Sequence, residues 1–87
     1  MAKVRIGDRD AAHVGRLLRE IGRTREFPEE IKHSARHWTR RVGGTMDRQD
    51  LQRVAWLLRD ASTRDAGPAE QREAARQWAA HLEGSIW

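Results

Sequence analysis

The chain contains no cysteine, only two prolines and no long apolar segment. The absence of cysteine excludes a disulfide framework, a thiolate zinc site and a thiol nucleophile, and it leaves the redox compartment open. No apolar run approaches the roughly 18 residues that a membrane span requires, and the N-terminus lacks the apolar core of a signal peptide. We therefore expect a cytoplasmic protein that has no membrane partner.

The length of 87 residues limits the architecture. Because domains commonly have roughly 100–200 residues, we expect a single helical domain over residues 1–87, with an N-terminal arm at 1–7. A chain of this size buries about 60–65% of the surface that it exposes when unfolded, so its core is small. This length excludes a barrel enzyme and a nucleotide-binding sheet joined to a substrate domain.

Positive charge is in excess and is unevenly distributed. The chain has 17 basic and 13 acidic side chains, and 15 of the basic ones are arginine. Residues 1–43 carry a net charge of +5, whereas residues 44–87 carry −1. Two explanations of the arginine excess stay open. One is a GC-rich genome, which the 12 alanines and seven glycines also suggest; the other is selection for bidentate contacts to phosphate.

The chain contains an internal repeat with an offset of 40 residues. Residues 13–42 align with residues 53–82, and nine of the 30 pairs are identical. Chance predicts about two or three identities, so we interpret the chain as a duplicated unit. The identical pairs are Val14/Val54, Leu17/Leu57, Leu18/Leu58, Arg19/Arg59, Pro28/Pro68, Glu30/Glu70, Ala35/Ala75, Arg36/Arg76 and Trp38/Trp78.

Each unit has the apolar spacing of two amphipathic helices. In the first, Val14, Leu17, Leu18 and Ile21 follow the i, i+3, i+4, i+7 pattern. Helix starts are expected at Asp8 or Asp10, Pro28, Asp47 and Pro68, and helix ends at Gly22, Gly43–Gly44 and Gly84. The sequence thus predicts an all-α fold, a four-helix bundle built from two pseudo-repeated helical hairpins. The predicted helices cover residues 9–21, 28–42, 47–62 and 68–83.

Two stretches resemble known helical proteins. The run from Val54 to Asp60, followed by residues 68–82 with Arg72, Ala75 and Trp78, resembles a HEAT-type helical hairpin. This resemblance covers both units, although a HEAT solenoid needs at least three. The segment from Pro28 to Arg36 resembles small uncharacterised helical proteins of proteobacterial and phage-borne genes. Both resemblances imply helical hairpins, and neither implies a chemical activity.

The four tryptophans differ in their predicted environment. Trp38 and Trp78 occupy equivalent positions in the apolar stripes, so we expect both in the core. Trp56 lies opposite the apolar stripe of its helix, where the first unit has Arg16. We expect Trp56 to anchor an interface, unless an end of the chain covers it. The terminal pair Ile86–Trp87 either folds back onto the bundle, which we favour, or docks on a partner. The predicted interface residues are Trp56, Arg53, Gln49, Gln52, Arg59 and Trp87.

Basic residues form a stripe on the polar faces of the first two helices. Such a stripe is typical of a solvated helix face, and also of a surface that follows a phosphate backbone. The expected loops of about five or six residues exceed the three- or four-residue turn of a helix-turn-helix. The predicted nucleic-acid contacts are Arg16, Arg19, Arg23, Lys32, Arg36 and Arg40.

Motifs for metal binding, cofactor binding and catalysis are lacking. His33 and His37 lie one helical turn apart but point away from the predicted core, and the second unit has Glu73 and Gln77 instead. The serines and threonines have no general base in a recognisable motif, and the glycines form no phosphate-cradling loop. We therefore expect no metal, no cofactor and no enzyme activity.

Protein binding is the function that the sequence favours. We expect a non-catalytic inhibitor or adaptor, of the kind that phages and mobile elements encode, which acts by covering a surface of its partner. The first alternative is a small basic nucleic-acid-binding protein that uses the first hairpin. The second alternative is a structural homodimer held by Trp56 and Trp87.

Overall fold

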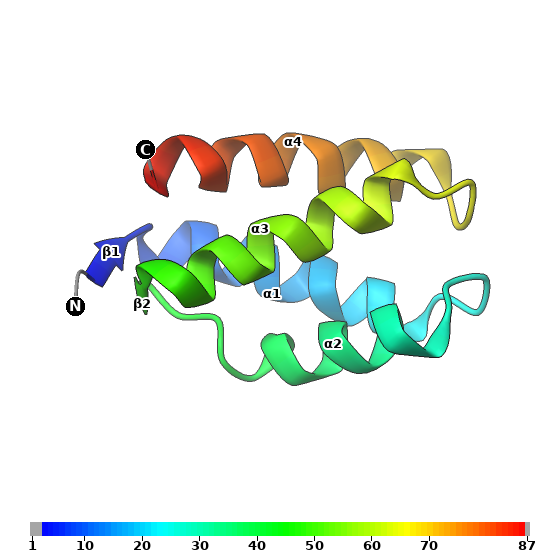
Figure 1. The fold of residues 1–87 in the computed structure, drawn as a ribbon, viewed down its shortest axis with the longest axis horizontal. Helices are drawn as coiled ribbons and strands as arrows, with labels where there is room; N and C mark the ends of the chain where they lie inside the picture. The colour runs from blue at the N-terminus through cyan, green and yellow to red at the C-terminus, as the bar shows by residue number, and fades with distance from the viewer. Residues whose placement is uncertain (1–2, 87) are drawn as a thin grey trace.

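The computed structural model describes residues 3–86, which form four helices and two short strands. Figure 1 shows the helices lying roughly along one direction as two hairpins, which confirms the expected all-α four-helix bundle. In chain order the elements are β1 (Lys3–Arg5), α1 (Asp8–Arg23), α2 (Glu29–Thr39), β2 (Thr45–Asp47), α3 (Arg48–Thr63) and α4 (Ala69–Ile86).

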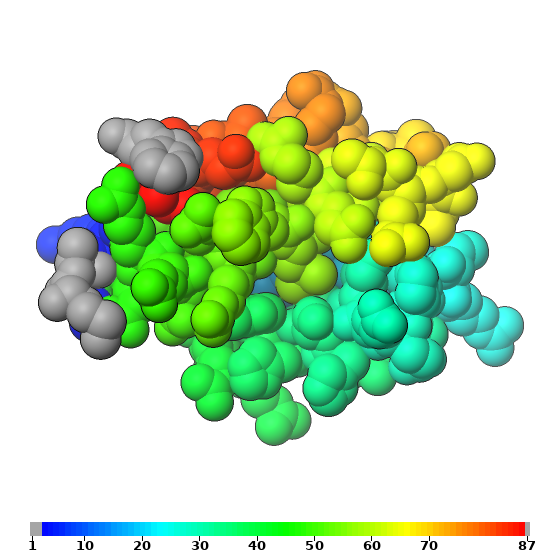
Figure 2. All heavy atoms as spheres, in the orientation of Figure 1, coloured from blue at the N-terminus to red at the C-terminus, as the bar shows by residue number. Residues whose placement is uncertain are grey.

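The two hairpins close into a bundle in which each helix has two neighbours. The helix pair α1 and α2 packs along its length, as does the pair α3 and α4. The hairpins meet where α1 contacts α4 and α2 contacts α3, and Figure 2 shows α3 on the near face of the molecule between α4 and α2. The loops at 24–28 and 64–68 lie together at one end of the molecule, which measures 35 × 20 × 20 Å, and the strands lie at the other end (Figure 1).

The core brings together equivalent positions of the two repeat units. Val14 and Val54 are completely buried, and so are Leu18 and Leu58. Burying a valine or leucine side chain stabilises the fold by about 1.5–3 kcal/mol, so both copies of the stripe contribute. Phe27 and Met46 are also buried, although neither belongs to a predicted apolar stripe. Both lie outside the helices, where helical periodicity gives no indication of burial.

The expectation that Trp38 and Trp78 are core residues is only partly correct. Both are half-buried and pack against the edge of the core. An indole is rarely buried completely because of its size, and this bundle is narrow. Trp78 uses its remaining surface for ring contacts, since His13 stacks on it at 5.8 Å and His81 meets it edge-on at 5.3 Å.

The N-terminal arm is a strand that pairs with a second strand the sequence did not predict. β1 and β2 are antiparallel, with Val4 opposite Met46. The amide of Ile6 continues the pairing by donating to the carbonyl of Gly44 at 2.8 Å. Segment 45–47 is therefore extended, and α2 ends at Thr39 rather than at the predicted residue 42. A three-residue strand is too short to produce a recognisable alternation.

Two predicted boundaries of α1 differ from the structure. Neither Asp8 nor Asp10 is the N-cap; Gly7 takes that position with a φ of 90°, and the two aspartates lie in the first turn. There they interact favourably with the positive end of the helix dipole. Gly22 does not end the helix but lies buried within it. A Cβ at Gly22 would lie 3.0 Å from Cγ of Arg36, so glycine permits the close approach of α1 and α2.

The last helix is longer than predicted. It passes through Gly84 and ends at Ile86, whose side chain is buried. Nη2 of Arg48, in the first turn of α3, donates a hydrogen bond of 2.7 Å to the carbonyl oxygen of Ile86. Burial and this bond hold the end of α4 against the start of α3, in agreement with the predicted fold-back of Ile86. Trp87 lies outside the described residues.

Candidate functional site

Trp56 projects from the face of α3 that points away from the core. Its side chain is 58% exposed. Among residues 3–86, no other large apolar side chain is exposed. Leu51, Val54 and Leu58 on the same helix are completely buried. The predicted outward orientation of Trp56 is therefore confirmed, and the described ends of the chain leave its side chain exposed. Val4 and Ile6 of the arm pack against the core instead.

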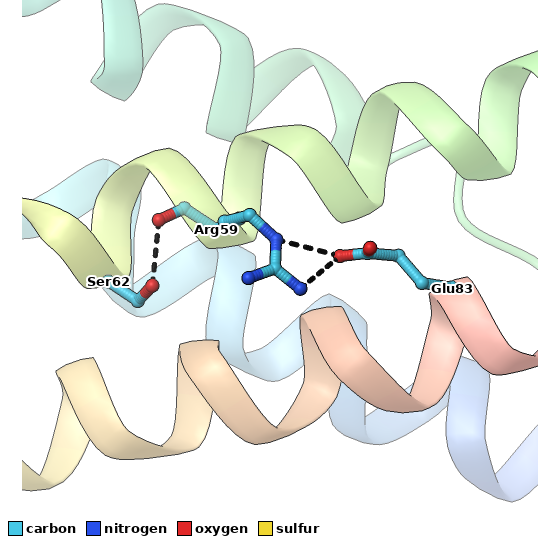
Figure 3. A network of polar contacts seen from close by, with 3 residues as sticks. All are labelled: Arg59, Ser62 and Glu83. Atoms are coloured by element: carbon cyan, nitrogen blue, oxygen red, sulfur yellow. Dashed lines mark hydrogen bonds and ion pairs between the residues drawn. The ribbon is translucent and has the colours of Figure 1, made fainter.

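The residues predicted around Trp56 divide into an open group and a paired one. Gln49 and Arg53 are exposed on α3, and Gln52 is half-buried. We call Gln49, Gln52, Arg53 and Trp56 the Trp56 face. Arg59 is directed to Glu83 on α4, to which its Nε and Nη2 donate (Figure 3). Arg59 therefore joins α3 to α4, and its guanidinium already has a charged partner.

Basic side chains of the first hairpin line an open depression of about 520 Å³ between α1 and α2. We call it the arginine depression. Apart from Thr39, every residue that lines it is an arginine or a histidine. Arg36 is oriented by a hydrogen bond of 2.9 Å from its Nη2 to the carbonyl oxygen of Gly22. The basic lining residues are Arg19, Arg36, Arg40, Arg41, His33 and His37.

The six predicted nucleic-acid contacts do not form one surface. Arg16 lines a neighbouring depression of about 460 Å³, which shares Arg19 with the arginine depression and is also lined by Asp8. Arg23 lines a different depression, together with Glu20 and Glu70. Lys32 forms an ion pair of 2.9 Å with Glu29, and only 15% of its side chain is exposed. The structure thus groups Arg16, Arg19, Arg36 and Arg40, and separates Arg23 and Lys32 from them. Sequence reasoning missed Arg41, which lies beyond the end of α2.

Acidic side chains pair with the cations of the second hairpin far more than with those of the first. In the second hairpin, four arginines have carboxylate partners. Among the cations of α1 and α2, only Lys32 forms an ion pair within the described part of the chain. The difference follows the net charges of the two halves. The paired arginines are Arg59, Arg64, Arg72 and Arg76.

Two exposed carboxylates have a pKa below the ordinary value. A hydrogen bond from Arg76 lowers the pKa of the Glu73 carboxyl, and Arg76 also contributes its positive charge. A hydrogen bond from Lys32 lowers the pKa of the Glu29 carboxyl in the same way. Both pairs lie within one helical turn at i and i+3, so they are local features of α4 and α2.

A cluster that the sequence did not indicate joins α1 to α4. Nε2 of His81 lies 3.0 Å from Oδ2 of Asp10, and the two residues are far apart in the chain. His13 and Trp78 lie next to them. Within residues 3–86, no group of three or more histidine, cysteine, aspartate or glutamate side chains is arranged to hold a metal ion. In the same range, no helix has the length and apolar character needed to cross a membrane.

The fold and these surfaces define a small helical-bundle protein with an exposed tryptophan and a concave basic surface. Comparisons with protein-family models, with curated proteins and with solved structures give no match for this chain. The resemblances to HEAT-type hairpins and to small phage-borne proteins therefore stay predictions.

Proposed function

We propose that this protein is a non-catalytic binding module that docks on a protein partner through the Trp56 face. The observation that carries the proposal is the 58% exposure of Trp56, because the other large apolar side chains of residues 3–86 are buried or half-buried. An exposed indole gains free energy when a partner removes it from water, and tryptophan and arginine are enriched at the centres of interfaces. Arg53 and Gln49 supply polar groups beside it.

The proposed mechanism is occlusion. The bundle covers a surface of its partner, with Trp56 as the desolvated anchor. The net charge of +5 on residues 1–43 steers the approach towards an acidic surface, since complementary charge mainly raises the association rate. An inhibitor or adaptor of a bacterial or phage system acts in this way. We place it in the cytoplasm, where a chain without cysteine needs no oxidising environment.

The proposed function involves no catalysis. The hydroxyl groups of Thr39 and Ser62 donate to backbone carbonyls of their own helices. Thr39 donates to Ala35 at 2.6 Å, and Ser62 donates to Arg59 at 2.7 Å (Figure 3). Both bonds occupy the hydroxyl within secondary structure.

Substitution of Trp56 tests the proposed interface. Tagged wild-type protein and Trp56→Ala are used for affinity capture from the source cells, and the captured candidate is then titrated as a purified protein. We expect Trp56→Ala to weaken the complex by about 30-fold or more, as for a hot-spot tryptophan. Gln77→Ala, an exposed position on α4, serves as the matched control and leaves affinity unchanged.

The oligomeric state distinguishes the partner from a second copy of the chain. Light scattering after size exclusion is measured for the wild type and for Trp56→Ala. A monomer in both cases, with loss of the complex in the variant, supports the proposal. A wild-type dimer that dissociates in Trp56→Ala establishes the structural homodimer instead. Unchanged complex formation and an unchanged oligomeric state would show that Trp56 is not an anchor.

A second candidate function is nucleic-acid binding by the first hairpin. The observation that favours it is the lack of carboxylate partners for the arginines of α1 and α2 within residues 3–86. Unpaired arginines on one concave surface attract a phosphate backbone, and each contact releases counterions. Binding of duplex DNA that falls steeply with rising salt supports this function, and an absence of DNA and RNA binding at low salt eliminates it.

A further inference from the structure

The internal repeat allows each arginine of the first hairpin to be compared with its counterpart in the second. Nε and Nη2 of Arg59 donate to Oε1 of Glu83 at 2.8 and 2.5 Å (Figure 3). Forty residues earlier, Arg19 takes the place of Arg59, and Gly43 takes the place of Glu83. Gly43 lies beyond the end of α2, and it lines the same open depression as Arg19. Arg19 therefore lacks the carboxylate that neutralises Arg59.

A second arginine also has a carboxylate partner in the second unit and none in the first. Arg76 on α4 pairs with Glu73, which lies one turn before it. The equivalent residues on α2 are Arg36 and His33. Arg36 donates to the backbone carbonyl of Gly22, a neutral acceptor, and it forms no ion pair among the described residues, although Glu29, the partner of Lys32, also feels its charge. Two ion pairs of the second unit have thus been replaced in the first unit by arginines that have no acidic partner among the described residues.

Both arginines, neither of which forms an ion pair within residues 3–86, line the arginine depression. Arg40 and Arg41 add two further guanidinium groups at the C-terminal end of α2, and no carboxylate lines the depression. Like charges in a concave surface with low-dielectric walls repel one another and concentrate the local field. Such a cluster is stabilised by an anion, and arginine suits phosphate because its planar group binds two oxygens at once.

We propose that the arginine depression is a phosphate-binding seat, and that it holds the phosphodiester backbone when the first hairpin binds nucleic acid. The inference rests on the second candidate function and names the residues that carry it. Arg19, Arg36, Arg40 and Arg41 contact phosphate. Arg23 and Lys32 do not, because Arg23 lines a depression with Glu20 and Glu70 and Lys32 is neutralised by Glu29.

The test compares two variants of equal charge from the same hairpin. Arg40→Gln/Arg41→Gln removes two exposed arginines from the seat, and Arg23→Gln/Arg25→Gln removes two exposed arginines outside it. Each is titrated with a short duplex DNA and with tripolyphosphate over a range of salt concentrations, after circular dichroism has shown that it is folded. We expect the first variant to lose about tenfold or more in DNA affinity and its salt slope to fall by about two, whereas the second changes affinity by less than about threefold.

The results distinguish two claims: that the first hairpin binds nucleic acid, and that the arginine depression holds the phosphate. If DNA binding is lost equally in both variants, or in neither, the seat is wrong while the nucleic-acid function stands. If tripolyphosphate binds through Arg40 and Arg41 but DNA does not, the seat stands and its ligand is a free polyphosphate. If neither probe binds the wild type, both claims are overturned.

A third variant restores the ion pair of the second unit without removing any arginine. Gly43→Glu places a carboxylate at the position equivalent to Glu83, on the depression that Arg19 also lines. The site has room, because a Cβ on Gly43 meets nothing closer than the carbonyl oxygen of Thr45 at 3.9 Å. We expect Gly43→Glu to remain folded and to weaken binding of both probes by about tenfold. Unchanged binding in this folded variant would contradict the role of Arg19.

Discussion

The side-chain amide of Gln71 donates a hydrogen bond of 3.1 Å to the hydroxyl of Thr24 and so joins the two hairpins at their loop ends. Thr24 follows the last residue of α1, and Gln71 lies in the first turn of α4. Gln71 is the one buried polar residue of the described chain, and in the repeat it takes the place of the buried Ile31. The Thr24 hydroxyl donates in turn to the carbonyl of Glu20 at 2.8 Å.

Replacement of Gln71 is expected to destabilise the bundle. Gln71→Ala removes the hydrogen bond and leaves a space beside Thr24, so we expect a loss of about 1–2 kcal/mol in the free energy of unfolding. Gln77→Ala on the exposed face of α4 is expected to change it by less than about 0.5 kcal/mol. Urea denaturation of the three proteins measures both values. Equal stability of Gln71→Ala and the wild type would show that the contact between the loops is not needed.

Two glycines are expected to respond to alanine with opposite signs. Gly67 has a φ of 76°, and a Cβ there would lie 2.9 Å from Oε1 of Gln71. Gly67→Ala is therefore expected to lower the free energy of unfolding by about 1–2 kcal/mol. The left-handed backbone conformation and the close contact with Gln71 both contribute to this loss. Gly15 lies within α1, and a Cβ there meets nothing within 4 Å. Gly15→Ala is expected to stabilise the protein by about 0.5–1 kcal/mol. Thermal denaturation by circular dichroism measures both, and changes of the same sign would contradict the assignment.

The core leucines of the two units are expected to be equally important for stability. Leu18 and Leu58 are repeat equivalents, and both are completely buried. Each substitution by alanine is expected to cost about 2–5 kcal/mol. Trp56→Ala is expected to cost less than about 0.5 kcal/mol because the indole is mostly exposed. Denaturant titration provides the values. A large loss of stability in Trp56→Ala would mean that this side chain supports the fold rather than an interface.

The ion pair between Glu73 and Arg76 is expected to respond to acid. The hydrogen bond from Arg76 holds the pKa of the Glu73 carboxyl below its ordinary value of 4.5 in the folded protein. A depressed pKa in the folded state means that the contribution to stability is complete above 4.5 and disappears as the pH falls through the folded value. NMR titration of the carboxyl carbons is expected to show the low pKa of Glu73 in the wild type and a return towards 4.5 in Arg76→Gln. An unchanged titration in the variant would show that Arg76 is not the cause.

Much of the fold could be predicted from the periodicity of apolar residues. Val14, Leu18 and their counterparts Val54 and Leu58 recur at helical spacing, and periodic burial is a local property of each helix. The outward orientation of Trp56 follows from the same geometry. The pairing of Val4 with Met46 could not be predicted, because it depends on contacts between segments far apart in the chain.

The binding surfaces could be predicted only in part. The basic stripe was visible in the sequence. The sequence did not show that Lys32 pairs with Glu29, or that Arg23 lines a separate depression with Glu20 and Glu70. The partner of Arg59 illustrates the reason. Glu83 lies 24 residues away on another helix, and an ion pair over that distance depends on how the helices pack.

The sequence by itself determined the duplication, the helical class and the excess of charge in the first half, because composition and periodicity are properties of the chain. Only the tertiary structure decided which charges are neutralised. Packing of α3 against α4 brings Glu83 to Arg59, whereas in the first hairpin α2 ends at Thr39 and no carboxylate lines the arginine depression that Arg19 enters. The absence of cysteine already excludes thiol chemistry in the sequence. The structure presents two surfaces for binding: one carries the exposed Trp56, and the other carries arginines that form no ion pair among residues 3–86.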